Sequence, residues 1–188
     1  MRYVSAAEAG ELLRIGEVGL VPTETVVGLV AGEAGLSRLY EIKGRDPGKQ
    51  IALLCGAANE ALALGRNAPP LALSLADRFW PGPLTLVLAA EGGGTVGVRV
   101  PAHPAALAVL ASHGGPLYAT SANRSGESDP RALKEVDPAI SANVDFAVEG
   151  EPGSGEASAV VDLSGDESRI LRPTKDLTEE VLYRLARE

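Results

Sequence analysis

The sequence predicts an α/β fold in which helices flank one twisted, mixed β-sheet. Two observations carry this prediction. Apolar runs of strand length, rich in β-branched residues, alternate along the chain with segments of helical periodicity. The 188 residues contain no internal repeat and no linker long or polar enough to separate domains. We therefore expect residues 1–188 to form a single domain.

The first quarter of the chain predicts a helix, two strands and a second helix. Ser5-Ala-Ala-Glu8 has the capping-box pattern, which predicts a helix from Ser5 to about Gly16. Residues 18–22 and 25–31 are apolar runs joined by a polar Pro-Thr-Glu sequence, so two strands with a turn between them are expected. Residues 36–42 follow as a short helix that ends beside Lys43 and Arg45.

The remainder continues the alternation of strands and helices. Further strands are predicted at residues 51–55, 84–89 and 95–100, with short late strands at 147–148, 160–163 and 170–171. Helices are predicted at residues 57–64, 70–79, 105–110 and 178–187. Residues 149–156, rich in Gly and Glu, are the most loop-like segment and a candidate for a mobile flap.

Composition excludes several functional classes. A formal net charge of -8 argues against nonspecific nucleic-acid binding, which needs a basic stripe, so any connection with RNA is expected to be indirect. Residues 100–123 carry no Lys, Arg, Asp or Glu, but their prolines and glycines rule out a spanning helix. The start of the chain lacks the apolar core of a signal peptide, and one cysteine, Cys55, allows no disulfide framework. A cytoplasmic protein without membrane contact is therefore expected.

Several familiar motifs are present only in outline. Residues 92–97 spell G-x-G-x-x-G but precede a strand, whereas a dinucleotide fingerprint opens a helix. Residues 44–49 are too short for a P-loop, and Gln50 stands where Ser or Thr is required. His103 is interpreted as a structural residue of a tight turn, and neither it nor His113 has a nucleophile nearby in sequence. A covalent hydrolase and a Cys/His metal cluster are both disfavoured.

Lys43, Arg45 and Lys49 place three cations within seven positions of a loop that contains Gly and Pro. In an acidic chain, such crowded charges repel one another unless an anion lies among them, and phosphate is the natural partner. The alternative is a solvated surface loop. Together with Ser121-Ala-Asn123, this loop predicts an anion and nucleotide site assembled from two distant segments. Ser121-Ala-Asn123 alone is equally consistent with a self-bonding turn.

Five further segments carry small hydroxyl or cationic residues at strand edges, flanked by Pro or Gly: residues 22–29, 80–85, 95–101, 120–126 and 170–173. In this order they resemble the YrdC-like family, which includes threonylcarbamoyl-AMP synthases, and the match runs from Pro22 to Pro173. The resemblance implies that L-threonine, bicarbonate and ATP are joined into threonylcarbamoyl-adenylate, with release of pyrophosphate, for tRNA modification. It also implies Mg²⁺ carried by ATP, with no direct protein ligand to the metal.

The resemblance further implies roles for individual residues. Lys43 and Arg45 are the catalytic candidates, because they would neutralise the departing pyrophosphate. A guanidinium fork such as that of Arg99 suits the carboxylate of an amino acid, the alternative for Arg99 being an ordinary ion pair at a strand end. The threonine site would comprise Thr23, Arg99, Ala119 and Ser158. The ATP site would comprise Arg45, Lys49, Thr95, Ser121, Asn123 and Arg172.

The chain departs from the family pattern at Val27, Asp46, Gln50, Leu54 and Ala159, which leaves the selectivity for the amino acid open. Its end near Glu188 predicts the short form, without the extra C-terminal domain of longer members. The alternative function is a nucleotide- or RNA-binding protein of the same fold without synthase activity. A third interpretation, a ribosome-maturation factor, would need a basic concave face. Expected partners are downstream threonylcarbamoyl-transfer proteins, and tRNA only indirectly.

Overall fold

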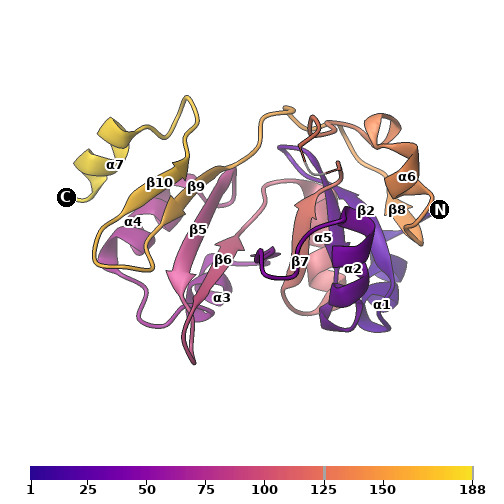
Figure 1. Ribbon diagram of the computed structural model, residues 1–188, viewed down its shortest axis with the longest axis horizontal. Helices are drawn as coiled ribbons and strands as arrows, with labels where there is room; N and C mark the ends of the chain where they lie inside the picture. Colours follow the sequence, from indigo (N-terminus) through magenta and orange to yellow (C-terminus); the bar gives the residue numbers. More distant parts are fainter. Residues whose placement is uncertain (125, 188) are drawn as a thin grey trace.

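The computed structural model describes residues 1–124 and 126–187, and it contains one ten-stranded mixed sheet with strand order β1-β8-β2-β3-β7-β4-β6-β5-β9-β10 (Figure 1). The strands are β1 (Arg2–Val4), β2 (Val18–Pro22), β3 (Val27–Ala31), β4 (Ala52–Leu54), β5 (Leu84–Ala89), β6 (Thr95–Arg99), β7 (Leu117–Ser121), β8 (Phe146–Val148), β9 (Ala159–Asp162) and β10 (Arg169–Arg172). The predicted α/β class with a mixed sheet is confirmed.

Helices cover the sheet along its length (Figure 1). The α-helices are α1 (Ala6–Arg14), α2 (Leu36–Lys43), α3 (Ala58–Ala63), α4 (Pro70–Phe79), α5 (Pro104–His113), α6 (Pro138–Ser141) and α7 (Glu179–Leu185), with 3₁₀ turns η1 (Glu33–Gly35) and η2 (Leu133–Glu135). Ser5 caps α1 as predicted, because its side chain accepts a hydrogen bond from Glu8 N at 3.2 Å. Helix α2 ends at Gly44, whose φ of 61° suits glycine.

The predicted strand pair 18–22 and 25–31 is the antiparallel pair β2 and β3. Alternation of side chains along this pair separates two cores. Val21 and Val30 pack with α1 and α5, whereas Leu20 and Leu29 pack on the other face with α2 and α6. A third core joins α3, α4 and α7 to β5, β6 and β9 at the far end of the sheet.

Strands β1 and β7 and helix α6 were not predicted. The most consequential omission is β7, because it lies inside the sheet between β3 and β4. Its sequence, Leu117-Tyr-Ala-Thr-Ser121, has only one β-branched residue and no strict alternation. Antiparallel pairing on both sides, including Val30 with Ala119 and Ala52 with Ala119, makes it a strand.

Other local predictions have clear outcomes. Gly92, Gly93 and Gly94 have positive φ and form the turn between β5 and β6, so the interpretation of this segment as a turn is confirmed. His103 caps α5 by accepting a hydrogen bond from Ala105 N at 3.1 Å, which agrees with a structural role. Cys55 is fully buried, and burial raises the pKa of its thiol to about 12.

Candidate active site

A cavity of about 430 Å³ lies over the middle of the sheet, where the two halves of the molecule meet. Side chains that alternate with core residues form its floor. In β5, Thr85 and Val87 face the cavity while their neighbours Leu84, Leu86 and Leu88 pack into the core. Gly97 of β6 adds to the floor, and a Cβ at this position would lie 3.3 Å from that of Ala52.

The cavity is predominantly cationic. Among the described residues that line it, the charged side chains are three arginines, Arg45, Arg99 and Arg172, and one carboxylate, Asp129. Hydroxyl groups supply most of the remaining polarity: Thr23, Thr25, Thr85, Thr120, Ser121 and Ser158. This composition suits a small anionic ligand that also offers hydrogen-bonding groups.

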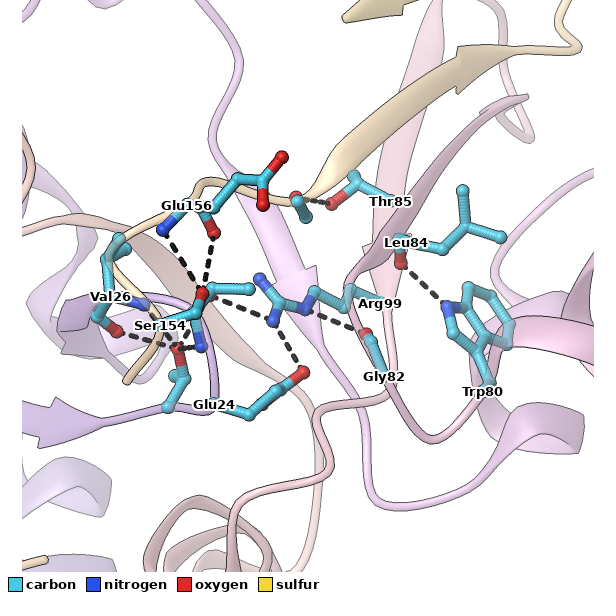
Figure 2. A network of polar contacts seen from close by, with 12 residues as sticks. Glu24, Val26, Trp80, Gly82, Leu84, Thr85, Arg99, Ser154 and Glu156 are labelled. Carbon is cyan, nitrogen blue, oxygen red and sulfur yellow. Dashed lines mark hydrogen bonds and ion pairs between the residues drawn. The ribbon is translucent and has the colours of Figure 1, made fainter. Parts of the chain in front are cut away.

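Arg99, the last residue of β6, is held in place by three groups (Figure 2). It is only 7% exposed, and its Nη2 lies 2.6 Å from Glu24 Oε1 and 3.0 Å from Thr25 Oγ1. Its Nε donates to Gly82 O at 3.2 Å. Its Nη1 has no hydrogen-bond partner among the described residues, and Arg99 is one of the residues that line the cavity. The Arg99 guanidinium was expected to bind a substrate carboxylate through two nitrogens, but two of its three nitrogens already bond to the protein.

The turn before β3 supplies the partners of Arg99. Thr23 Oγ1 donates to Val26 O at 2.6 Å and lies 2.8 Å from Thr25 Oγ1, with which it shares a hydrogen bond. Thr23 Oγ1 also accepts hydrogen bonds from Thr25 N and Val26 N. Thr23 is only 4% exposed, and these hydrogen bonds stabilise the turn that contains Glu24 and Thr25.

The segment predicted as a mobile flap is docked onto this turn. Ser154 N donates to Glu24 O at 2.9 Å, Gly155 N to Thr25 O at 2.8 Å and Gly153 N to Arg131 O at 2.9 Å. A Cβ on Gly153 would lie 2.3 Å from Thr25 O, so only glycine allows this close approach. We name residues 150–157 the strap.

Trp80 caps the end of α4 and begins the turn that leads into β5. Trp80 is buried, and its Nε1 donates to Leu84 O at 2.7 Å, as Figure 2 shows. The same turn also presents the carbonyl of Gly82 to Arg99. This turn therefore helps to position a cavity residue.

Lys43 joins the two segments from which the nucleotide site was predicted. It is only 5% exposed, and its ammonium group donates to Ser121 O at 2.5 Å and Asn123 O at 2.6 Å, and also to Asn123 Oδ1. Burial lowers the pKa of Lys43 to about 8; the negative charge of Asp129 opposes this shift, and the positive charge of Arg45 adds a smaller contribution in the same direction as burial. Lys43 lies behind the cavity wall, because it contributes nothing to the lining.

The loop after α2 places its cations differently. Arg45 lines the cavity, and its Nε and Nη2 donate to Lys49 O at 3.1 Å and Gln50 O at 2.7 Å. The Lys49 side chain is exposed and does not line the cavity. Gln50 and Thr95 bond to each other twice, so Thr95 supports the rim through Gln50.

At the opposite wall, Arg172 of β10 donates from Nε to Ser158 O at 2.6 Å and from Nη2 to Ser158 Oγ at 3.2 Å. Ser158 Oγ also lies 2.9 Å from Thr85 Oγ1. Burial lowers the pKa of Arg172; the positive charge of Arg99 acts in the same direction and Asp129 opposes it. This wall therefore combines a guanidinium with two hydroxyls.

The structure brings most of the predicted site residues to one cavity: Thr23, Arg45, Arg99, Ala119, Ser121, Ser158 and Arg172 line it. Lys43 and Asn123 support the wall from behind, and Lys49 and Thr95 lie at or beyond the rim. Of the departures from the pattern, Gln50 and Leu54 line the cavity, but Val27 is a core residue. Sequence reasoning missed Glu24, Thr25, Gly82 and Asp129. Asking which group neutralises Arg99 would have pointed to Glu24.

In residues 1–124 and 126–187, no group of three or more His, Cys, Asp or Glu side chains is arranged to hold a metal ion. Over the same ranges, every helix is too short or too polar to cross a bilayer.

The fold and the cavity define a class of protein: a mixed-sheet α/β domain with a cationic site for a small anionic ligand. Comparison with protein families matches residues 11–174 to the family Sua5/YciO/YrdC, described as "Telomere recombination". The chain belongs to this family, as its resemblance to YrdC-like proteins predicted.

Curated relatives are similar over most of the chain. A threonylcarbamoyl-AMP synthase of Bacillus subtilis is 36% identical, over 94% of this chain and 56% of the relative. One of Pyrococcus abyssi is 34% identical, over 92% and 55%, and one of Halorhodospira halophila is 37% identical, over 77% and 82%. The chain thus spans about half the length of the first two relatives.

Solved structures agree with this assignment. P. abyssi Sua5 complexed with L-threonine has a TM-score of 0.87 and 31% identity, over 98% of this chain and 60% of that chain. E. coli YciO has a TM-score of 0.79 at 23% identity, over 91% and 93%, and shows the likeness of fold alone.

Proposed function

We propose that the chain forms threonylcarbamoyl-adenylate and pyrophosphate from L-threonine, bicarbonate and ATP. The observation that carries this proposal is the cavity itself, which Arg45, Arg99 and Arg172 line together. The names of the relatives from B. subtilis and P. abyssi, and the threonine bound to P. abyssi Sua5, support it. The product would serve a later transfer to tRNA by other proteins.

In this proposal the two ends of the cavity have different ligands. The threonine carboxylate meets Arg99 Nη1, and its hydroxyl lies among Thr25, Thr85 and Ser158. The ATP phosphates meet Arg45 and the Ser121 segment, with Arg172 between the two substrates. Lys43 stabilises the phosphate end indirectly, because its charge and hydrogen bonds hold residues 121–123 in place.

The proposed reaction needs no covalent intermediate on the protein. The neutral threonine amine adds to the carbon of bicarbonate, and loss of one water leaves a carbamate anion. A carbamate oxygen then forms a bond to the α-phosphorus, while the bond from that phosphorus to the bridging oxygen of pyrophosphate breaks. Among the described residues, the cavity lining has hydroxyls but no cysteine or histidine to act as an activated nucleophile with its base. The protein's contribution is therefore positioning and charge stabilisation.

Mg²⁺ carried by ATP would neutralise phosphate charge as pyrophosphate departs. The site fits such an ion in one respect: the Asp129 carboxylate faces the cavity beside its arginines. Arg45 supplies a fixed positive charge at the same end, and no step depends on its moving a proton.

The direct test is to incubate the chain with ATP, Mg²⁺, bicarbonate and L-threonine, and to detect the adenylate by mass spectrometry and pyrophosphate by a coupled assay. Product that requires all three substrates is expected. Binding of ATP without product under these conditions would contradict synthase activity and favour a nucleotide-binding protein of the same fold.

A further inference from the structure

Asp129 is the one acidic side chain among the described residues that line the cavity. The three other charged groups that line it are arginines. Its carboxylate forms no ion pair with the described residues. A bare carboxylate at a site for phosphates repels them, unless a cation lies between the two.

The backbone that directly follows Asp129 is held by hydrogen bonds to β3, the strap and Glu135. Val27 N donates to Pro130 O at 2.8 Å, which ties the next residue to the start of β3. Gly153 N of the strap donates to Arg131 O at 2.9 Å, and Glu135 Oε2 accepts from Arg131 N at 2.9 Å. Asp129, which lines the cavity, is therefore joined directly to an anchored segment.

The surroundings of Asp129 belong to the phosphate end. It follows Ser121 and Asn123 in the chain, and its negative charge opposes the lowering of the pKa that burial causes at both Lys43 and Arg172. Mg²⁺ is commonly held by one or two carboxylates together with substrate phosphates and water. A single carboxylate at the phosphate end can supply the protein's share of such a coordination shell, and the phosphates and water can supply the rest.

We infer that Asp129 is a protein ligand, direct or through one water, for the divalent cation that accompanies the nucleotide. This inference rests on the proposed function, because it needs ATP at the Arg45 end of the cavity. It adds a protein contact to an ion for which the sequence predicted none.

The inference predicts opposite effects of one substitution on two affinities. Asp129→Asn removes a negative charge near the phosphates, so ATP should bind more tightly than to the wild type when EDTA removes all metal. With saturating Mg²⁺ the same variant should bind ATP more weakly. The gain in ATP affinity due to Mg²⁺ should fall by about tenfold or more, since losing even an indirect metal contact typically costs this much.

The measurements are calorimetric titrations of the 188-residue chain with a non-hydrolysable ATP analogue, with EDTA and with Mg²⁺. Bound Mn²⁺, followed by electron paramagnetic resonance, provides a second readout that needs no turnover. Glu127→Gln is the matched control, because it removes the same charge from an exposed position two residues away. It should change the two affinities little and in the same direction.

Equal gains from Mg²⁺ in Asp129→Asn and the wild type would overturn the inference, provided that both fold by circular dichroism. Asp129→Ala must give the same pattern. A loss of threonine affinity in the absence of nucleotide and metal would assign Asp129 to the substrate ammonium group instead. Failure of the wild type to bind ATP would contradict the proposed function itself.

Discussion

Glu24 Oε1 lies 2.6 Å from Arg99 Nη2, and this ion pair joins the turn before β3 to the end of β6 across the cavity wall. The Arg99 side chain is 9% exposed and that of Glu24 is 22% exposed. The second carboxylate oxygen, Oε2, is buried without a hydrogen-bond partner. The main role of the Glu24 carboxylate is therefore to neutralise the positive charge of Arg99.

The first prediction concerns this pair. Glu24→Gln should lower the free energy of unfolding by about 1–3 kcal/mol, because it leaves a mostly buried guanidinium without its counter-charge. Urea denaturation checks this, with exposed Glu156→Gln as the control. A double-mutant cycle with Arg99→Met should give a coupling energy of about 1 kcal/mol or more. No coupling would show that the pair does not stabilise the turn.

The second prediction separates two cations of one loop. Arg45 lines the cavity and Lys49 does not. Arg45→Ala should therefore slow pyrophosphate release by about 10²–10³-fold, the usual effect of removing one preorganised charge partner. Lys49→Ala should slow it by less than about tenfold. Steady-state kinetics with each substrate varied would check both, and equal effects would contradict the placement of Arg45.

The third prediction uses the pKa of about 8 for Lys43. Above this pH the amine is neutral, so the positive charge behind residues 121–123 is lost and ATP binding weakens. Bound phosphates should in turn raise the pKa of Lys43. A rise of about one unit corresponds to about tenfold weaker ATP binding at high pH than at pH 7. Titrations with ATP between pH 7 and 10 check this. In Lys43→Met the affinity should be low at every pH and lack this dependence.

The fourth prediction tests the strap. Gly153→Ala places a Cβ 2.3 Å from Thr25 O, so the strap or the turn beneath it must shift. We expect the free energy of unfolding to fall by about 1–3 kcal/mol. Relative to the wild type, the KM for threonine should rise more than the KM for ATP, because Thr25 lies at the Arg99 end of the cavity. Gly115→Ala is the control, since a Cβ there meets nothing within 4 Å. An unchanged threonine KM would place the strap outside the amino-acid site.

The fifth prediction concerns selectivity. One methyl group is worth roughly 1–3 kcal/mol in an apolar pocket, so threonine should be preferred to serine by about 10–200-fold at most. Thr25, Thr85 and Ser158 offer polar partners for a hydroxyl, and valine would leave one of them unpaired. Valine should therefore be the poorest substrate. Competition at fixed ATP and bicarbonate checks the order, and valine equal to threonine would contradict a hydroxyl-reading pocket.

The elements that sequence reasoning found are those with strong local signals. Ser5 caps α1, Pro70 begins α4 and the apolar run of β5 needs no partner to be recognised. Strand β7 has no comparable signal, and it forms because β3 and β4 offer pairing partners on both sides. Seven of the predicted site residues line the cavity, and the signals for them were the order of the family motifs and the cluster of cations after α2.

By itself, the sequence determined the α/β class, most helices and strands, the resemblance to a family and the set of polar residues from which the site is built. These follow from local periodicity, capping and motif order, which neighbouring residues encode. Only the tertiary structure decided which of those residues face the cavity. Lys43 donates hydrogen bonds to three acceptors in residues 121–123 and so lies behind the cavity wall. Glu24 forms an ion pair with Arg99, whereas Asp129 lines the cavity. Such assignments depend on pairings between residues 75 to 80 positions apart, and a charge reveals its role only when its partners in space are known.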